Sequence, residues 1–472
     1  MQVEPQALLP ELILLVGGLA VLIGGSFLPR ERQWVARLGA VAALLAAAAA
    51  ALAGLSGPAR TVFDMTYAVD TPTGIARLVV ALATLLVIGL GVDELAGDRQ
   101  ESETYALLLL SGLGAVVLAG ASDLLVLAVG FLLASIPLYG LVGQARTSGA
   151  AEAAMKTYLL GALAGITLLL GVTVLYGVAG TTSYAGLADA LDGAPSSAVA
   201  FGAVAVVVGL MFKAGGVPMH FWVPDAAEGS TVTVAAFLTT VPKVGAVVAA
   251  YRLVDALPGS VDVALLLALL AVASMTLGNL AAYTQTDPRR LLGWSTVSQV
   301  GFLLVPVVVA GRSDLALPSM LLYLGAYAVT NLTAFAVIAA LPGHRDLESY
   351  RGLAGAHPWL GAALVVSLLG LVGTPPTAVF VGKLTTATAA WDGGWAWLAL
   401  AVVVNSLVSL FYYLRWLVPA FRVGDAAGRV ATGAFAPARW ATAAAVVAGV
   451  AGLALGLGAG AAWALVDGPL VR

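Results

Sequence analysis

Four lysines are the residues of this sequence whose types and positions could carry out chemistry. They are Lys156, Lys213, Lys243 and Lys383, and each lies within or at the edge of a long hydrophobic segment. Most of the eighteen arginines lie instead in the short polar connections. A buried ammonium can release its proton, whereas a guanidinium effectively stays charged. This division predicts that the lysines stand where a proton must bind and leave.

Three of these lysines lie well inside their apolar segments. Lys213 and Lys243 fall near the middle of theirs, and Lys383 falls in the second half of its own. A lysine near the centre of a membrane helix costs roughly 2.5–3.5 kcal/mol on insertion scales, so such a residue normally has a role and a partner. The alternatives are a structural ion pair or a side chain that extends to the lipid headgroups. Those alternatives have most weight for Lys156, at the start of its segment.

His220 opens the polar turn that joins the segments of Lys213 and Lys243. We expect it either to pass a proton between these lysines or toward water near Asp225 and Glu228, or to be a simple hydrogen-bonding residue.

Two further charged features need partners or solvent. Arg77, in the third apolar segment, is expected to face a neighbouring subunit or an acid elsewhere in the chain. A run of five acids is expected to be a solvated face, with docking of a basic partner as the alternative: Asp93, Glu94, Asp98, Glu101 and Glu103.

The composition excludes a soluble globular protein. Of 472 residues, 61% are hydrophobic and only 10% are charged, which is too little polar surface for a soluble chain of this size. The absence of cysteine excludes thiolate-bound clusters, thioether-linked haem and disulfides, and three scattered histidines do not suggest a metal site. The sequence predicts an all-α, polytopic membrane protein.

About fourteen apolar stretches are long enough to cross a hydrocarbon core about 30 Å thick. The first lacks a basic n-region and a convincing cleavage site, so it is interpreted as a retained span rather than a signal peptide. The expected spans are 8–27, 35–55, 73–92, 104–120, 122–143, 155–179, 196–219, 231–254, 261–283, 291–311, 317–341, 357–390 (interrupted), 395–418 and 439–466.

Arginine distribution predicts the orientation. With both termini on the extracytoplasmic side, the cytoplasmic connections hold about three times as many arginines as the opposite side, as the positive-inside rule requires. The cytoplasmic set is Arg30, Arg32, Arg37, Arg99, Arg146, Arg289, Arg290, Arg345, Arg351, Arg422, Arg429 and Arg439, and the opposite set is Arg60, Arg252, Arg312 and Arg472.

Two spans are interrupted in the same way. The seventh contains Gly215-Gly-Val-Pro218 and the twelfth contains Gly373-Thr-Pro-Pro376, each with a lysine close by. Such breaks are tolerated where the helix faces protein or an internal water cavity, and paired broken helices are typical of internally repeated transporters. The alternative is the ordinary enrichment of Gly and Pro in membrane helices. The expected units are three N-terminal spans (1–103), two inverted five-helix repeats (104–254 and 255–418) and a C-terminal span (419–472).

At these residues the chain resembles the antiporter-like membrane subunits that are shared by bacterial NADH-quinone oxidoreductase (respiratory complex I) and Mrp-type cation/proton antiporters, and it is closest to the subunit N type. The resemblance covers about residues 5–420. It is carried by Glu152-Ala-Ala-Met-Lys156, Tyr158-Leu-Leu-Gly161, Gly209-Leu-Met-Phe-Lys213, Val217-Pro-Met-His220-Phe-Trp-Val-Pro-Asp225, Val241-Pro-Lys243, Gln285-Thr-Asp-Pro-Arg-Arg-Leu-Leu292, Tyr327-Ala-Val-Thr-Asn331, Asp346-Leu-Glu-Ser-Tyr-Arg-Gly352, Gly373-Thr-Pro-Pro376 and Gly382-Lys383.

The resemblance implies a proton path in which Lys213 is the central lysine of the first half-channel, Lys243 the connecting lysine and Lys383 the lysine of the second half-channel. Lys156 and His220 also match family positions in the path. It implies no cofactor in this chain. NADH or another donor, flavin, iron-sulfur clusters and quinone are expected in partner subunits. The expected partners are the other membrane subunits of a complex I-like assembly and the lipid of a bacterial inner membrane, with no nucleic acid.

The chain departs from the family at three positions. Leu132 stands where the fifth span normally carries a glutamate that pairs with the central lysine, and Trp294 and Gln299 stand where a tyrosine and a histidine are usual. Two other functions therefore remain open. One is a subunit of an Mrp-type cation/proton antiporter, and the other is a structural paralogue that no longer pumps.

Overall fold

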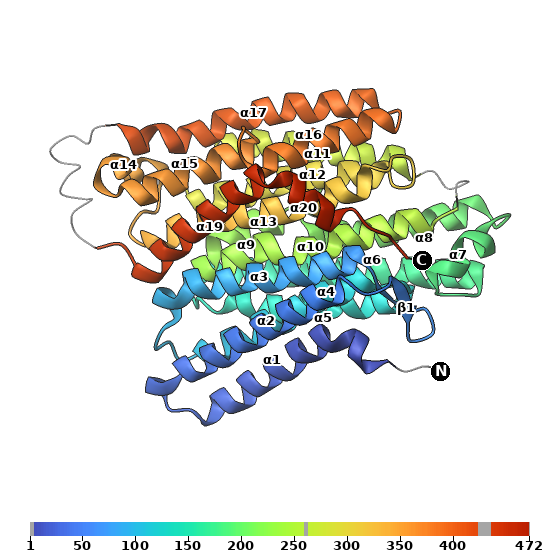
Figure 1. The fold of residues 1–472 in the computed structure, drawn as a ribbon, viewed down its shortest axis with the longest axis horizontal. Coiled ribbons are helices and arrows are strands. Elements are labelled where there is room, and N and C mark those ends of the chain that lie inside the picture. The colour runs from blue at the N-terminus through green and yellow to red at the C-terminus, as the bar shows by residue number, and fades with distance from the viewer. Residues whose placement is uncertain (1–3, 259–262, 423–435, 472) are drawn as a thin grey trace.

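The computed structural model describes residues 4–258, 263–422 and 436–471. Within them, long helices run side by side along the long axis of the molecule, and the only sheet is a two-stranded hairpin (Figure 1). Helix α1 begins, and the described chain ends, at the same end of this bundle (Figure 1).

The long helices are α1 (Leu9–Phe27), α2 (Trp34–Gly54), α3 (Thr71–Leu95), α4 (Glu101–Gly120), α5 (Leu124–Gly143), α6 (Ser148–Ala179), α8 (Ser196–Ala214), α10 (Val232–Ala256), α11 (Ala264–Tyr283), α12 (Pro288–Val308), α13 (Ala316–Ala340), α15 (Pro358–Val372), α16 (Ala378–Asp392), α17 (Ala396–Phe421) and α19 (Arg439–Leu457). The short elements are η1 (Pro5–Leu8), η2 (Arg30–Arg32), β1 (Arg60–Val62), β2 (Tyr67–Val69), α7 (Tyr184–Leu191), α9 (Trp222–Gly229), η3 (Leu347–Tyr350), α14 (Leu353–Ala356) and α20 (Ala459–Val466).

The number of spans agrees with the sequence-based expectation. Thirteen helices of the described chain are long and apolar enough to cross a membrane, and α15 with α16 makes the interrupted fourteenth. Helix starts follow local capping chemistry, because a side-chain oxygen at the first position accepts a bond from a free backbone N–H group. Asp70, Asp123, Thr147 and Thr231 cap α3, α5, α6 and α10 in this way.

The two five-helix units have corresponding packing. In the first unit α4 packs on α5 and α6 packs on α8; in the second unit α11 packs on α12 and α13 packs on α15. A unit of five spans crosses the membrane an odd number of times, so the second unit starts from the opposite side and is inverted relative to the first. The broken helices are α8 followed by α9, and α15 followed by α16.

Each broken helix ends on a glycine in the left-handed conformation, with φ of 84° at Gly215 and 88° at Gly373. Such a residue closes a helix at low cost only when it has no side chain. The next turns contain Pro218 and Pro376, each after a cis peptide bond. The predicted interruptions are confirmed at both places.

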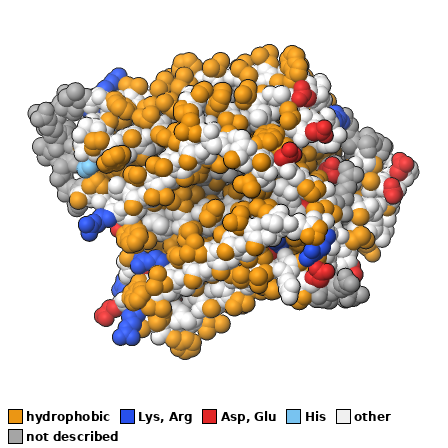
Figure 2. Space-filling view, in the orientation of Figure 1, with side chains coloured by type: hydrophobic (Ala, Val, Ile, Leu, Met, Phe, Trp, Pro, Cys, Tyr) orange, Lys and Arg blue, Asp and Glu red, His pale blue; other side chains and the backbone are white. Residues whose placement is uncertain are grey.

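The most buried spans are α10, α12 and α13, which pack on one another at the centre of the molecule. Hydrophobic side chains cover the middle of the surface shown in Figure 2, and charged side chains gather at its two ends. This distribution fits a protein whose middle zone lies in lipid or against other apolar surfaces.

Three local elements were not expected from the sequence. The stretch interpreted as a polar turn becomes helix α9 from Trp222 onward, helix α7 forms within a connection, and the hairpin pairs Arg60 with Val69. Helix α9 has only eight residues, so neither its length nor its composition distinguished it from a loop.

Candidate functional site

Lys213 lies on the last turn of α8 with its side chain fully buried. Its Nζ donates a hydrogen bond to the Oγ atom of Ser135 on α5, at 2.5 Å. The rings of Phe131 and Phe212 lie 5.1 and 5.8 Å from the same nitrogen. The charge is therefore surrounded by a hydroxyl and two aromatic faces, which are neutral groups that attract a cation.

Position 132 does not face this lysine. Leu132 is 41% exposed on the outer surface of the described chain, whereas Ser135, one turn later on α5, is fully buried against Lys213. The sequence departure is therefore located on a lateral face of the subunit. Sequence reasoning missed Ser135, although it lies in the same short segment as Leu132.

Lys243 follows a proline inside α10 and is also fully buried. Pro242 has no N–H group to donate to the carbonyl of Leu238, four residues earlier. The Nζ of Lys243 donates a hydrogen bond to that free carbonyl instead, at 2.6 Å. The Val-Pro-Lys sequence thus builds its own binding site for the ammonium.

An aromatic pair lies between these two lysines. Trp222, the first residue of α9, donates its Nε1–H to the carbonyl of Phe212, at 3.1 Å, and the two rings are 5.2 Å apart. The indole ring lies 5.0 Å from the Nζ of Lys243. Trp222 therefore fixes the break after α8 and covers Lys243 at the same time, a role that the sequence did not reveal.

Lys383 binds the second broken helix at its end. Its Nζ donates to the carbonyls of Leu371 and Val372, both at 3.0 Å, and lies 4.0 Å from the ring of Phe302. The last carbonyls of a helix have no partner within the helix and carry the negative end of its dipole, so they favour a cation. A Cβ atom at Gly373 would lie only 2.9 Å from the Cδ atom of Lys383, so this glycine also makes room for the lysine.

The three buried lysines share one property. None of them takes part in the ion pairs of the described residues, and their hydrogen bonds go to a hydroxyl and to backbone carbonyls. Loss of a proton from such a lysine leaves no buried carboxylate without its counter-charge.

His220 is buried just before α9, and its Nδ1 has no hydrogen-bond partner in the described part of the chain. Its ring lies between Phe221 and Trp294, with centroids 4.1 and 5.6 Å away. No hydrogen bond joins it to Lys213 or Lys243. Trp294, a departure from the family pattern, also has an unpartnered buried Nε1, so two free polar atoms occur on neighbouring rings.

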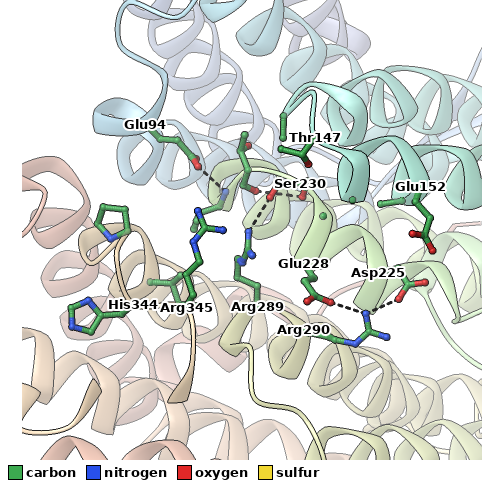
Figure 3. A pocket seen from close by; sticks show the side chains of 18 of the residues that line it. Glu94, Thr147, Glu152, Asp225, Glu228, Ser230, Arg289, Arg290, His344 and Arg345 are labelled. Atoms are coloured by element: carbon green, nitrogen blue, oxygen red, sulfur yellow. Dashed lines mark hydrogen bonds and ion pairs between the residues drawn. The ribbon is translucent and has the colours of Figure 1, made fainter. Parts of the chain in front are cut away.

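Lys156 differs from the other lysines because its side chain is 43% exposed. It lines a cavity of about 730 Å³ between α6, α9 and α12, and it binds Asp225 and Glu152, each at 2.7 Å. Asp225 also binds Arg290 at 2.7 Å, so one carboxylate joins both units; Figure 3 shows Asp225 and Glu228 on either side of Arg290. The ion-pair alternative for Lys156 is what the structure contains.

The acidic run is a solvated face only in part, because Asp93, Glu94 and Asp98 are exposed whereas Glu101 is buried. Glu94 accepts bonds from the first N–H groups of α10, at Val232 and Thr233, and Asp93 does the same for α19. Glu101 is buried and accepts bonds from Gly97 and Tyr105. Glu94 and Asp93 thus satisfy helix starts that lie far away in the sequence, whereas the partners of Glu101 are local.

Arg77 does find its acid within the chain. It forms a two-point ion pair with Glu11 on α1, with Nε and Nη2 at 2.7 and 2.9 Å from the carboxylate oxygens. Arg252 on α10 likewise binds Asp70 at 2.5 Å in a buried pair. Both arginines are fully committed to structural contacts, in contrast to the three lysines.

This geometry, two inverted units with a buried lysine beside each break, defines an antiporter-like membrane subunit. The chain belongs to the family described as "NADH:quinone oxidoreductase/Mrp antiporter, TM", whose profile matches residues 121–409. That region contains all four lysines.

Among curated proteins, the chain is 58% identical to NADH-quinone oxidoreductase subunit N of Mycobacterium sp. (strain JLS), over 98% of both chains. Among solved structures, it is similar to a chain of respiratory complex I from Thermus thermophilus, with 32% identity, a TM-score of 0.84 and coverage of 98% of this chain and 100% of that one. It is also similar to a chain of the Mrp complex from Dietzia sp. DQ12-45-1b, with 25% identity, a TM-score of 0.83 and coverage of 98% and 96%.

Proposed function

We propose that this chain is the N-type membrane subunit of a proton-translocating NADH-quinone oxidoreductase in a bacterial inner membrane. The support is the high identity to curated subunit N proteins over nearly the whole chain. In this proposal the chain itself carries no redox centre. Electron transfer from NADH to quinone takes place in partner subunits, and its free energy drives proton movement here.

Protons are carried by reversible protonation of Lys213, Lys243 and Lys383. The observation behind this assignment is that all three ammonium groups are buried and bound by neutral oxygen atoms only. A group held in this way can exchange a proton without breaking an ion pair, which would cost several kcal/mol in a buried site. The arginines, which effectively cannot release a proton, lie in ion pairs or outside the path formed by the three lysines.

Lys156 and His220 are assigned to the passage of protons between the cavity beside α9 and the path formed by the three lysines. Lys156 lines the cavity and shares Asp225 with Arg290, while His220 precedes the same short helix. A cavity lined by charged groups is suited to supply protons to a buried path. The units 1–103, 104–254, 255–418 and 419–472 would then be a supporting part, two half-channels and a closing span.

Mrp-type antiport is the second candidate, favoured by the full-length structural similarity to the Mrp complex chain. The curated relatives named subunit N favour the first. The third possibility, a subunit that no longer pumps, was motivated by Leu132 and Gln299. The argument for a non-pumping subunit is weaker in the structure, because Leu132 faces outward and Lys213 has Ser135 as a partner.

The test is proton uptake into inverted membrane vesicles that contain the complete assembly, measured per NADH oxidised. Lys213→Ala is expected to lower this ratio while the assembly stays intact, and Arg32→Ala, at an exposed position, is the control. Leu132→Glu in parallel shows whether a carboxylate at this lateral position changes the ratio. Unchanged pumping in Lys213→Ala would refute the proton-path assignment, and sodium uptake in place of proton uptake would favour the antiporter.

A further inference from the structure

A groove of about 610 Å³ lies beside the last turns of α17, away from the lysines and from the cavity beside α9. Helix α17 is at the outer edge of the bundle, and it ends at the end of the molecule opposite to the one at which α1 begins (Figure 1). The lining of the groove comes mainly from α17 and from the stretch that contains η3. It combines an apolar wall with charged groups, as a site for an amphipathic ligand requires.

The α17 side of the groove forms the apolar wall. Phe411, Leu414 and Val418 follow one another at helical spacings of three and four residues, so they lie on one face of the helix. Phe411 is 63% exposed and Val418 is 41% exposed in the described chain. An exposed apolar strip on a membrane helix lies against lipid chains or against another apolar surface.

Two arginines continue this strip toward the end of α17. Arg415 and Arg422 are at the same helical spacing as the wall, and both line the groove. Arg415 donates hydrogen bonds to the backbone carbonyls of Tyr283 and Gln285, at the end of α11. Arg422 is exposed and takes part in none of the hydrogen bonds and ion pairs of the described chain. Within the described residues, neither guanidinium has a carboxylate partner.

The acids on the opposite side of the groove are engaged within their own segment. Asp346 accepts a hydrogen bond from the backbone N–H of Ser349 at 2.8 Å, and Glu348 binds Arg351 at 2.6 Å. In the described chain, neither acid pairs with the two arginines of α17. A ligand of the groove must therefore bring the negative charge that these arginines lack.

The arginine distribution predicts that this end of the bundle is cytoplasmic. The cytoplasmic leaflet contains anionic lipids, and basic pockets between helices on that side are suited to their head groups. A guanidinium can hold two oxygens of one phosphate in a planar contact. From Phe411 to Arg422 the helix rises about 16 Å, which is enough for a phosphate at one end and the upper part of an acyl chain along the wall.

We propose that this groove binds an anionic phospholipid of the cytoplasmic leaflet, with its phosphate on Arg415 and Arg422 and one acyl chain along Phe411, Leu414 and Val418. Because Arg415 also binds carbonyls at the end of α11, the lipid braces the packing of α11 on α17. This binding is independent of the proposed function, since no lysine of the proton path lines the groove.

The experiment uses the complete assembly in phosphatidylcholine vesicles that contain a small share of phosphatidylglycerol with a diazirine in one acyl chain. Light links the diazirine to neighbouring protein atoms, and mass spectrometry of peptides locates the adduct. Two basic groups, each worth a factor of about five toward an anionic head group, predict a roughly twentyfold excess over the same diazirine on phosphatidylcholine. This excess is expected at residues 411–418, and added inorganic phosphate should leave it in place.

Arg422→Gln is the most informative variant, because Arg422 has no partner in the described chain whose loss could disturb the fold. It is expected to lower the phosphatidylglycerol adduct about fivefold and to leave the phosphatidylcholine adduct unchanged. Arg415→Gln combined with Arg422→Gln should remove the preference. Arg32→Gln, at an exposed arginine in η2, is the matched control and should change neither adduct.

Several results would overturn the proposal. Equal adducts from both lipids in the native assembly would show that α17 is an ordinary lipid-facing surface. The absence of any adduct at residues 411–418 would show that another subunit covers the groove, and loss of the excess with inorganic phosphate would show an anion site without lipid. A preference that persists in the double arginine variant would also refute it. The rate of NADH oxidation in the same vesicles shows that each variant is assembled.

Discussion

The ion pair between Arg77 and Glu11 allows a quantitative test of how the outermost helix α1 is held. The guanidinium makes three hydrogen bonds, two to the Glu11 carboxylate and one to the carbonyl of Ala7. The side chains are only 5% and 7% exposed. Removing one partner of a buried pair leaves an uncompensated charge and costs about 3–5 kcal/mol.

We therefore expect Arg77→Met to lower the free energy of unfolding by about 3–5 kcal/mol, because Glu11 keeps only the hydroxyl of Tyr67 as a partner. Glu11→Leu should cost a similar amount. The double variant has no unpaired charge, and replacing a buried pair by apolar residues is often close to neutral. Its loss should be smaller than either single loss.

The assay is denaturant unfolding of the purified chain in detergent micelles, followed by tryptophan fluorescence and analysed as a double-mutant cycle. Single losses below about 1 kcal/mol that simply add in the double variant would refute the reasoning. Such a result would mean that water reaches the pair or that α1 is held by apolar packing alone.

Three further predictions concern the site and its surroundings. Ser135→Ala removes the hydroxyl bound to Lys213, a contact worth about 1.5–3 kcal/mol, so the rate of proton uptake in vesicles should fall about tenfold or more; an unchanged rate would contradict this role. Gly373→Ala should destabilise the chain more than Gly394→Ala in thermal unfolding, because both have positive φ but only Gly373 has a close neighbour at the added Cβ; equal losses would show that the crowding does not matter. Burial lowers the pKa of His344 below its ordinary 6.5, so the unfolded chain takes up a proton more readily than the folded one as pH falls through 6.5; the melting temperature should fall between pH 7 and 5.5, and His344→Gln should reduce that fall.

The sequence predicted the features that depend on local chemistry. Gly215 and Gly373 mark the helix breaks because a left-handed residue and a following proline stop a helix wherever it is placed. The burial of Lys213, Lys243 and Lys383 followed from the apolar segments around them. These are statements about a few consecutive residues, and the structure confirms them.

Features that depend on distant parts of the chain could not be predicted in this way. Glu94 looks like a surface residue in its own segment, yet its partners at the start of α10 are 138 and 139 residues away. Glu11 stands near the start of an apolar span, and nothing in the sequence pairs it with Arg77. The side on which the Leu132 side chain faces depends on how α5 is rotated about its axis relative to α8. A motif alignment does not contain that rotation.

The roles of Ser135 and Trp222 were missed for a related reason. Ser135 lies inside an apolar segment and Trp222 lies in a stretch interpreted as a polar turn, and in neither case does the residue type alone distinguish a packing residue from a neighbour of lysine. Their hydrogen bonds to Lys213 and Phe212 show these roles. In other sequences, a useful signal would be a polar residue that lies one helical turn from a departure from the family pattern, as Ser135 lies one turn from Leu132.

The central claim is that the three buried lysines must lose and regain a proton, and replacing each in turn with arginine tests it most directly. Arginine keeps the positive charge but effectively cannot release a proton. The measurement is the number of protons translocated per NADH oxidised by the intact assembly. We expect Lys213→Arg, Lys243→Arg and Lys383→Arg each to lose as much of this ratio as the corresponding alanine variant. A full ratio with arginine at all three positions would contradict the relay, because a fixed charge would then be sufficient.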